Sequence, residues 1–117
     1  MQRNPAFVSW KTDLDGFGKR NKLRPTRIEV LDRADGVESD FWLEDGLLLS
    51  GIDIEEDRTR GLSVDIMLQT TAAGDRNHLT HRVAGVTRLN LAKPAEHGER
   101  LEIEDAAGTV TIVRFES

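Results

Sequence analysis

The apolar pattern of this 117-residue chain changes its period once, near residue 25, and this change limits what the chain can fold into. Before it, apolar residues recur at the spacing of one helical face: Phe7, Trp10, Leu14 and Phe17. This spacing predicts a helix over about residues 5–22, with Pro5 in its first turn. Gly16 and Gly18 are poor helix formers, so we expect the last turn to fray or break.

From Thr26 to about residue 116 the pattern alternates, as it does in half-buried strands. The clearest strand is residues 62–68, and we expect the terminal strands near 101–105 and 109–115 to form a hairpin. Turns are expected at Asp35-Gly36 and at Glu44–Gly46. Residues that disturb the alternation predict a bulge or a close backbone approach at Gly51 and a kink or bulge at Ala84-Gly85, with Val83 and Val86 on opposite faces.

A helix followed by five to seven short strands indicates a mainly β, α+β fold. We expect a curled antiparallel sheet, either a roll or a small barrel, with the N-terminal helix packed on it. The length suits a single domain over residues 1–117. The last strand is apolar on both faces, which predicts a central position or cover by the helix.

Composition excludes several classes of protein. The chain has no cysteine, which removes disulfides, thiolate metal sites and cysteine nucleophiles. No segment approaches the ~20 apolar residues of a membrane span, and no secretory signal is recognised at the N-terminus. We therefore expect a cytoplasmic protein without membrane contact. Net charge is −5, but residues 1–33 carry eight basic and four acidic side chains.

The basic part of this charge lies mostly in one segment, where five cations fall within nine residues: Lys19, Arg20, Lys22, Arg24 and Arg27. Such a segment is a candidate nucleic-acid contact, because cations neutralise phosphates with little sequence preference. The alternative is that they complement the dipole at the helix C-terminus. No aromatic residue is interleaved with them to stack on bases, so the alternative is favoured.

The three histidines are His78, His81 and His97. Imidazole is a common general base and metal ligand, so a small enzyme or metal-binding domain built on His78 and His81 is a further alternative. On a strand, however, residues three apart face opposite ways. Ordinary structural or solvated histidines are therefore favoured. The carboxylates of residues 55–57 and of Glu102 and Glu104 are expected on solvated faces. The sequence predicts no catalytic residue, metal or cofactor.

Short motifs distributed along most of the chain resemble domain-of-unknown-function family 5335, a group of small bacterial proteins. They include Thr26-Arg27-Ile28-Glu29-Val30, Leu49-Ser50-Gly51-Ile52, His78-Leu79-Thr80-His81 and the ending Leu101–Glu104 and Gly108–Thr111. The family has no assigned activity, so the resemblance implies no chemistry. It does direct attention to one candidate site, which comprises His78, Thr80, His81 and Arg82.

We therefore expect a non-catalytic structural or protein-interaction domain, which binds an unknown protein partner or itself as a homodimer. Antiparallel sheets leave strand edges that a protein must cover or pair. An exposed apolar edge in the folded chain would favour this hypothesis, and a closed barrel would count against it.

Overall fold

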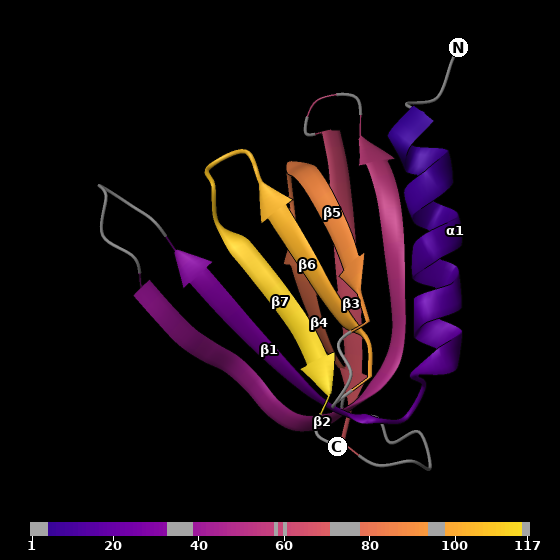
Figure 1. Ribbon diagram of the computed structural model, residues 1–117, viewed down its shortest axis with the longest axis vertical. Coiled ribbons are helices and arrows are strands. Elements are labelled where there is room, and N and C mark those ends of the chain that lie inside the picture. Colours follow the sequence, from indigo (N-terminus) through magenta and orange to yellow (C-terminus); the bar gives the residue numbers. More distant parts are fainter. Residues whose placement is uncertain are drawn as a thin grey trace.

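The computed structural model describes residues 5–32, 39–57, 59, 61–70, 78–93 and 98–115. The expected turn at Asp35-Gly36 and the loop histidine His97 lie outside these ranges. One helix precedes the strands, as predicted (Figure 1). The elements are α1 (Pro5–Arg20), β1 (Pro25–Asp32), β2 (Ser39–Asp57), β3 (Gly61–Gln69), β4 (His78–Val83), β5 (Val86–Ala92), β6 (Arg100–Asp105) and β7 (Val110–Phe115).

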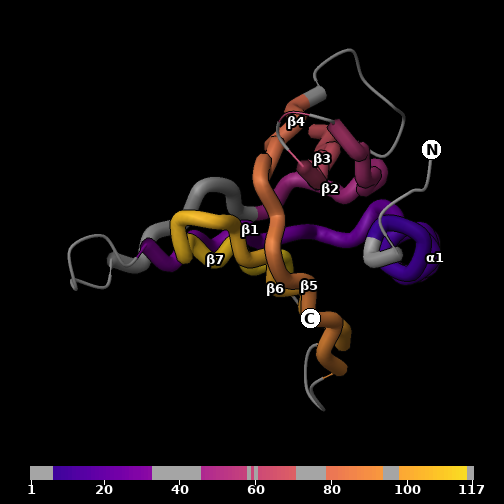
Figure 2. The backbone as a smooth tube through the Cα atoms, turned by 90° about the horizontal axis from the view of Figure 1, so that it is seen from above, coloured from indigo at the N-terminus to yellow at the C-terminus, as the bar shows by residue number. Residues whose placement is uncertain are grey.

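The seven strands form a single antiparallel sheet in the order β4-β3-β2-β1-β7-β6-β5. The predicted mainly β fold is confirmed, and the sheet curls but does not close. Seen from above, β2, β3 and β4 lie on one side and β5 and β6 on the other, with α1 beside the opening between them (Figure 2). The two edge strands, β4 and β5, are therefore consecutive in sequence but form the two opposite edges of the sheet.

Strand β2 forms the corner of the sheet, because its first half pairs with β1 and its second half with β3. The expected turn at Glu44–Gly46 was wrong. Asp45 and Leu47 instead pair with neighbouring residues of β1, and Gly46, at φ 93°, is the extra residue of a bulge. The predicted bulge near Gly51 is confirmed by a register shift between Leu49 and Gly51. These irregularities let one long strand bend from one part of the sheet to the other.

Helix α1 buries the apolar face that its spacing predicts, with Leu14 and Phe17 essentially inaccessible. The expected fraying at the two glycines was wrong, because the helix continues to Arg20. At Gly18 the packing supplies a reason for glycine: a Cβ there would lie 3.2 Å from the Cγ2 atom of Ile52. The tertiary contact with β2 thus explains a residue that helix propensity disfavours.

The short connection that follows α1 is hydrogen-bonded to the bend in β2. Leu23 adopts φ 67°, a left-handed conformation that is uncommon for a residue with a side chain. Its N–H donates to the carbonyl of Leu49 (2.7 Å), and the N–H of Leu49 donates to the carbonyl of Arg24 (3.1 Å). These two hydrogen bonds hold the end of the helix against the bend in the sheet.

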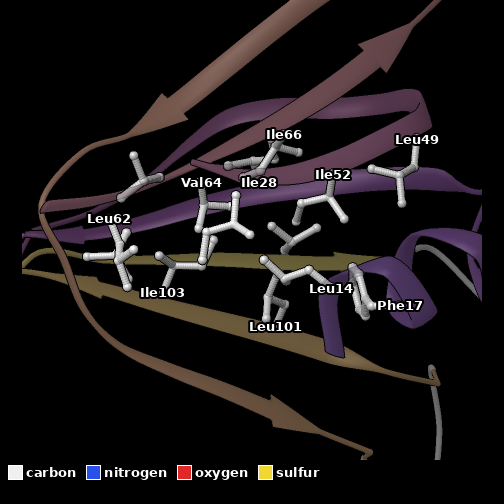
Figure 3. Close-up of a cluster of buried hydrophobic side chains, with 14 of the residues drawn as sticks. Leu14, Phe17, Ile28, Leu49, Ile52, Leu62, Val64, Ile66, Leu101 and Ile103 are labelled. Atoms are coloured by element: carbon white, nitrogen blue, oxygen red, sulfur yellow. The ribbon is translucent and has the colours of Figure 1, made fainter. Parts of the chain in front are cut away.

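The core lies between the curled strands and α1 (Figure 3). Strand β3 contributes the alternating face that the sequence predicts: Leu62, Val64, Ile66 and Leu68. Strand β7 is central, between β1 and β6, and it pairs with β6 in the predicted hairpin. The kink at Gly85 is confirmed, at φ 66°, but Val83 and Val86 both enter the core because the chain turns between them.

Candidate functional site

Strand β4 carries the candidate site and occupies an edge of the sheet. It pairs with β3 alone, so within the described ranges no strand hydrogen-bonds to its other side. Every second N–H and C=O of such a strand points outward, where it can pair with another extended chain. The sequence singled out residues 78–82 without indicating that they lie at an edge, since edge and central strands share the same alternation.

The side chains on the core face of β4 become more exposed from Val83 back toward Leu79. Leu79, His81 and Val83 stand opposite Leu68, Ile66 and Val64, in that order. Val83 is buried and His81 is partly buried, but Leu79 is 40% exposed. Of the large apolar side chains identified as exposed, Leu79 is the one that belongs to a strand. The apolar surface of the sheet therefore continues to an uncovered edge.

The opposite face of β4 is charged, and its one arginine is paired with carboxylates. Arg82 donates from Nε to Asp65 Oδ1 (2.7 Å) and from Nη2 to Asp65 Oδ2 (2.9 Å), a bidentate pair across the β3–β4 ladder. The same Nη2 lies 3.3 Å from Oε2 of Glu55 on β2. The two hydrogen bonds from Arg82 lower the pKa of the Asp65 carboxyl below its ordinary value of 3.8. Thr80 is exposed on this face.

His78 and His81 do not occupy equivalent strand positions. Strand β4 is uninterrupted from His78 to Val83, so backbone positions 78 and 81 have opposite parity. The His78 side chain lies outside the described part of the structure. No group of three or more metal-ligating side chains converges within that part. The geometry gives no support to a shared metal site on these two histidines.

A hollow of about 300 Å³ lies next to the β4 edge. The end of β4 forms one wall, and β1, β7 and the β6–β7 turn form the other. The lining residues are Val30, His81, Arg82, Val83, Ala84, Asp105, Thr109 and Thr111. The Asp105 carboxylate is already engaged, because Oδ1 accepts the N–H groups of Ala107 (2.9 Å) and Thr109 (3.0 Å). The hollow therefore offers space beside the edge rather than a reactive group.

The other edge strand, β5, is protected. Its pairing with β6 shifts register between Val86 and Arg88, which marks a bulge at Thr87. The Thr87 hydroxyl lies within 3.4 Å of the carbonyls of Glu104 and Asp105. The Arg88 side chain, 81% exposed, adds a charge. Bulges are one device by which proteins prevent strand pairing at an edge, and of the two described edge strands only β4 pairs without one.

Within the basic segment, Arg20 is a structural residue. It donates from Nε to Glu99 Oε1 (2.7 Å) and from Nη2 to Glu99 Oε2 (2.6 Å). Buried Asn21 adds a hydrogen bond from Nδ2 to Glu99 Oε1 (3.1 Å). Arg20 and Asn21 together hold the pKa of Glu99 below its ordinary value of 4.5, although burial opposes this shift. Nothing in the sequence pointed to Glu99, which lies just before the predicted strand near residues 101–105.

Arg24 is also committed to the fold. Its Nη1 donates to Asn21 Oδ1 (2.8 Å), and its guanidinium carbon lies 4.7 Å from the ring centroid of Phe115. A Cβ on Gly98 would meet Nη1 at 3.0 Å, so the guanidinium also packs on this glycine. Arg27 is part-buried on β1. Three of the five cations are thus integrated into the domain or partly covered by it.

Lys19, Arg20 and Lys22 are exposed, and of these Arg20 is engaged with Glu99, which leaves Lys19 and Lys22. They line a shallow hollow of about 220 Å³ between α1 and the bulge of β2, together with Asp15, Gly18, Ser50, Gly51 and Ile52. Asp15 brings a negative charge to this hollow, which opposes the binding of an anion. The geometry thus reduces the predicted five-cation nucleic-acid contact to two lysines beside a carboxylate.

Comparison with known proteins adds no relative: no family model, no curated protein and no solved structure matches this chain. The resemblance to domain-of-unknown-function family 5335 stays a prediction. The described part of the chain contains one helix, α1, of 16 residues, and it is too short and too polar to cross a membrane.

Proposed function

We propose that this domain is a non-catalytic protein-interaction module that binds an extended segment of a partner along β4. The observation that carries the proposal is the contrast between the two edges of the open sheet. Strand β5 is interrupted by a bulge at Thr87, whereas the pairing of β4 with β3 shows no register shift. An extended segment added to β4 would satisfy its outward backbone groups, as in other cases of recognition by strand addition.

The surroundings of β4 supply features that such recognition uses. Backbone hydrogen bonds give affinity without sequence preference, and pockets beside the edge receive alternate side chains. The exposed Leu79 offers an apolar contact, and the hollow next to Val83 offers about 300 Å³ of space. Arg82 contributes little net charge, because Asp65 and Glu55 neutralise it. These features favour an uncharged or apolar strand as the bound segment.

The alternative of a nucleic-acid accessory protein is less favoured. It rests on Lys19 and Lys22, the exposed cations of the segment other than the Glu99-paired Arg20, and these two lie beside α1 rather than next to β4. Two phosphate contacts supply only weak, salt-sensitive binding. A metal-binding or enzyme function on His78 and His81 likewise has no supporting geometry among the described residues.

The test is selection of binding peptides from a displayed library of random eight-residue sequences, followed by mapping of the bound site from amide chemical shifts. We expect selected peptides to perturb the amides of β4 and to lose at least about tenfold in affinity against the Leu79→Lys variant, because a charged edge opposes strand addition. The matched control is Val8→Lys, which changes an exposed apolar residue on α1. Peptides that perturb only other surfaces would contradict the proposal.

A further inference from the structure

We infer that the strand bound by β4 is the β4 strand of a second copy of this chain, so that two copies form one continuous antiparallel sheet about a two-fold axis. This inference rests on the proposed function, because it names the partner of the same edge. Two-fold symmetric dimers are the commonest assemblies of identical soluble chains. It would also cover an edge that nothing in the described fold protects.

The sequence of β4 complements itself in one register. With the axis at His81, Leu79 stands opposite Val83 of the second copy, which pairs two apolar residues on the core face of both sheets. Thr80 then stands opposite Arg82 of the second copy, which places a hydroxyl beside a guanidinium. His81 faces its own counterpart. The register centred on Thr80 would instead place Leu79 against His81, so the axis at His81 is preferred.

Charge does not oppose this arrangement. Arg82 is the one Lys or Arg residue of β4, and its guanidinium is paired with Asp65 and lies within 3.3 Å of Glu55. Two such strands can therefore approach without bringing unpaired cations together.

The packing beside the edge agrees with a second copy as the occupant. Leu79 is exposed at the end of β4 that lacks cover, and the hollow lies beside Val83 at the other end. In the register centred on His81, the second copy brings its Val83 to the exposed Leu79. Because the axis repeats the contact, each apolar pair forms twice. One six-residue strand from each copy makes a small interface, so we expect a Kd of about 10 μM to 1 mM.

The experiment is sedimentation equilibrium of the untagged full chain at about pH 7.5, over concentrations from about 5 μM to about 1 mM. We expect the average mass to rise from 13.1 kDa toward twice that value. Leu79→Lys should raise the Kd at least about tenfold, because both copies then place a lysine in the interface. Val8→Lys, on α1, should leave the Kd unchanged. Thermal unfolding of both variants checks that each remains folded.

Hydrogen exchange provides a second measurement that does not depend on any variant. Amides of β4 should exchange more slowly at about 1 mM than at about 10 μM, whereas the edge amides of β5 should not change. A chain that stays monomeric throughout overturns the inference. So does a dimer that Leu79→Lys leaves intact. If the monomeric chain still binds selected peptides along β4, the proposed function stands and only the identity of the partner was wrong; if it binds none, both fail.

Discussion

Arg20 and Glu99 form a bidentate ion pair that joins the last residue of α1 to the segment before β6, across 79 positions of the sequence. The carboxylate side chain is 9% exposed, whereas that of Arg20 is 51% exposed. Asn21 and Arg24 extend the same cluster to the ring of Phe115. The residues that looked most suited to binding phosphate are thus largely used to fasten the helix to the sheet.

Glu99→Gln should destabilise the domain, because it weakens a buried, charge-assisted cluster. The expected loss is about 1–3 kcal/mol of unfolding free energy, the usual range for disrupting buried hydrogen bonds to a charged group. Urea denaturation measures this loss. Glu104→Gln is the matched control, since the Glu104 pair with Arg88 is 3.7 Å long and exposed, and its removal should cost less than about 1 kcal/mol. Equal losses in the two variants would show that the Glu99 cluster has no special role.

Stability should fall as the pH is lowered through the acidic range. Arg20 lowers the pKa of Glu99 below 4.5, and Arg82 lowers that of Asp65 below 3.8. A carboxyl group whose pKa is lower in the folded state stabilises the fold fully above its ordinary pKa and loses that contribution as the pH falls toward the folded value. Denaturation measured at pH steps between about 6 and 3 should show a shallower decline for Glu99→Gln. A parallel decline would exclude Glu99 as a source of the effect.

Leu23→Gly should stabilise the protein by up to about 1 kcal/mol. The left-handed backbone at Leu23 is unfavourable for any residue with a Cβ, and the relief of this strain exceeds the contacts that the 38% exposed side chain loses. The reciprocal change is Gly85→Ala, which places a Cβ on a residue at φ 66° and should cost a similar amount. Thermal denaturation of both variants measures the change in stability, and a change of the same sign in both would contradict the prediction.

Binding to a DNA duplex, measured by fluorescence anisotropy at low salt, should have a shallow salt dependence. Two exposed lysines predict a slope of the logarithm of affinity against the logarithm of salt near about −2, since each phosphate contact contributes about −0.9. Lys19→Gln/Lys22→Gln should abolish this binding. The control Lys11→Gln, which removes a cation paired with Asp53, should not. A slope near about −4 or steeper would mean that Arg20 and Arg24 leave their partners to contact phosphate.

The sequence anticipated those parts of the fold that depend on local pattern. The period of the apolar residues located α1, β3 and the hairpin of β6 and β7, because burial on one face imposes that period directly. Glycines marked the bulge near Gly51, where a Cβ would lie 3.3 Å from Cε of Met67, and the corner at Gly85, whose φ of 66° is disfavoured in other residues. At Gly46 the glycine predicts a turn, whereas in the structure it is the extra residue of a bulge within β2.

Only the tertiary structure decided which distant side chains contact each other and which strands form the edges of the sheet. An arginine that pairs with a distant carboxylate has the same local sequence as one that faces solvent, so nothing near Arg20 or Arg24 revealed their partners. The position of β4 at an unprotected edge depends on the strand order, and strand order is set by contacts between segments far apart in sequence. The sequence by itself determined α1, β3 and the β6–β7 hairpin with their buried faces, because those follow from side-chain spacing. The fastening of the helix and the exposed edge arise only when the folded chain brings distant residues together.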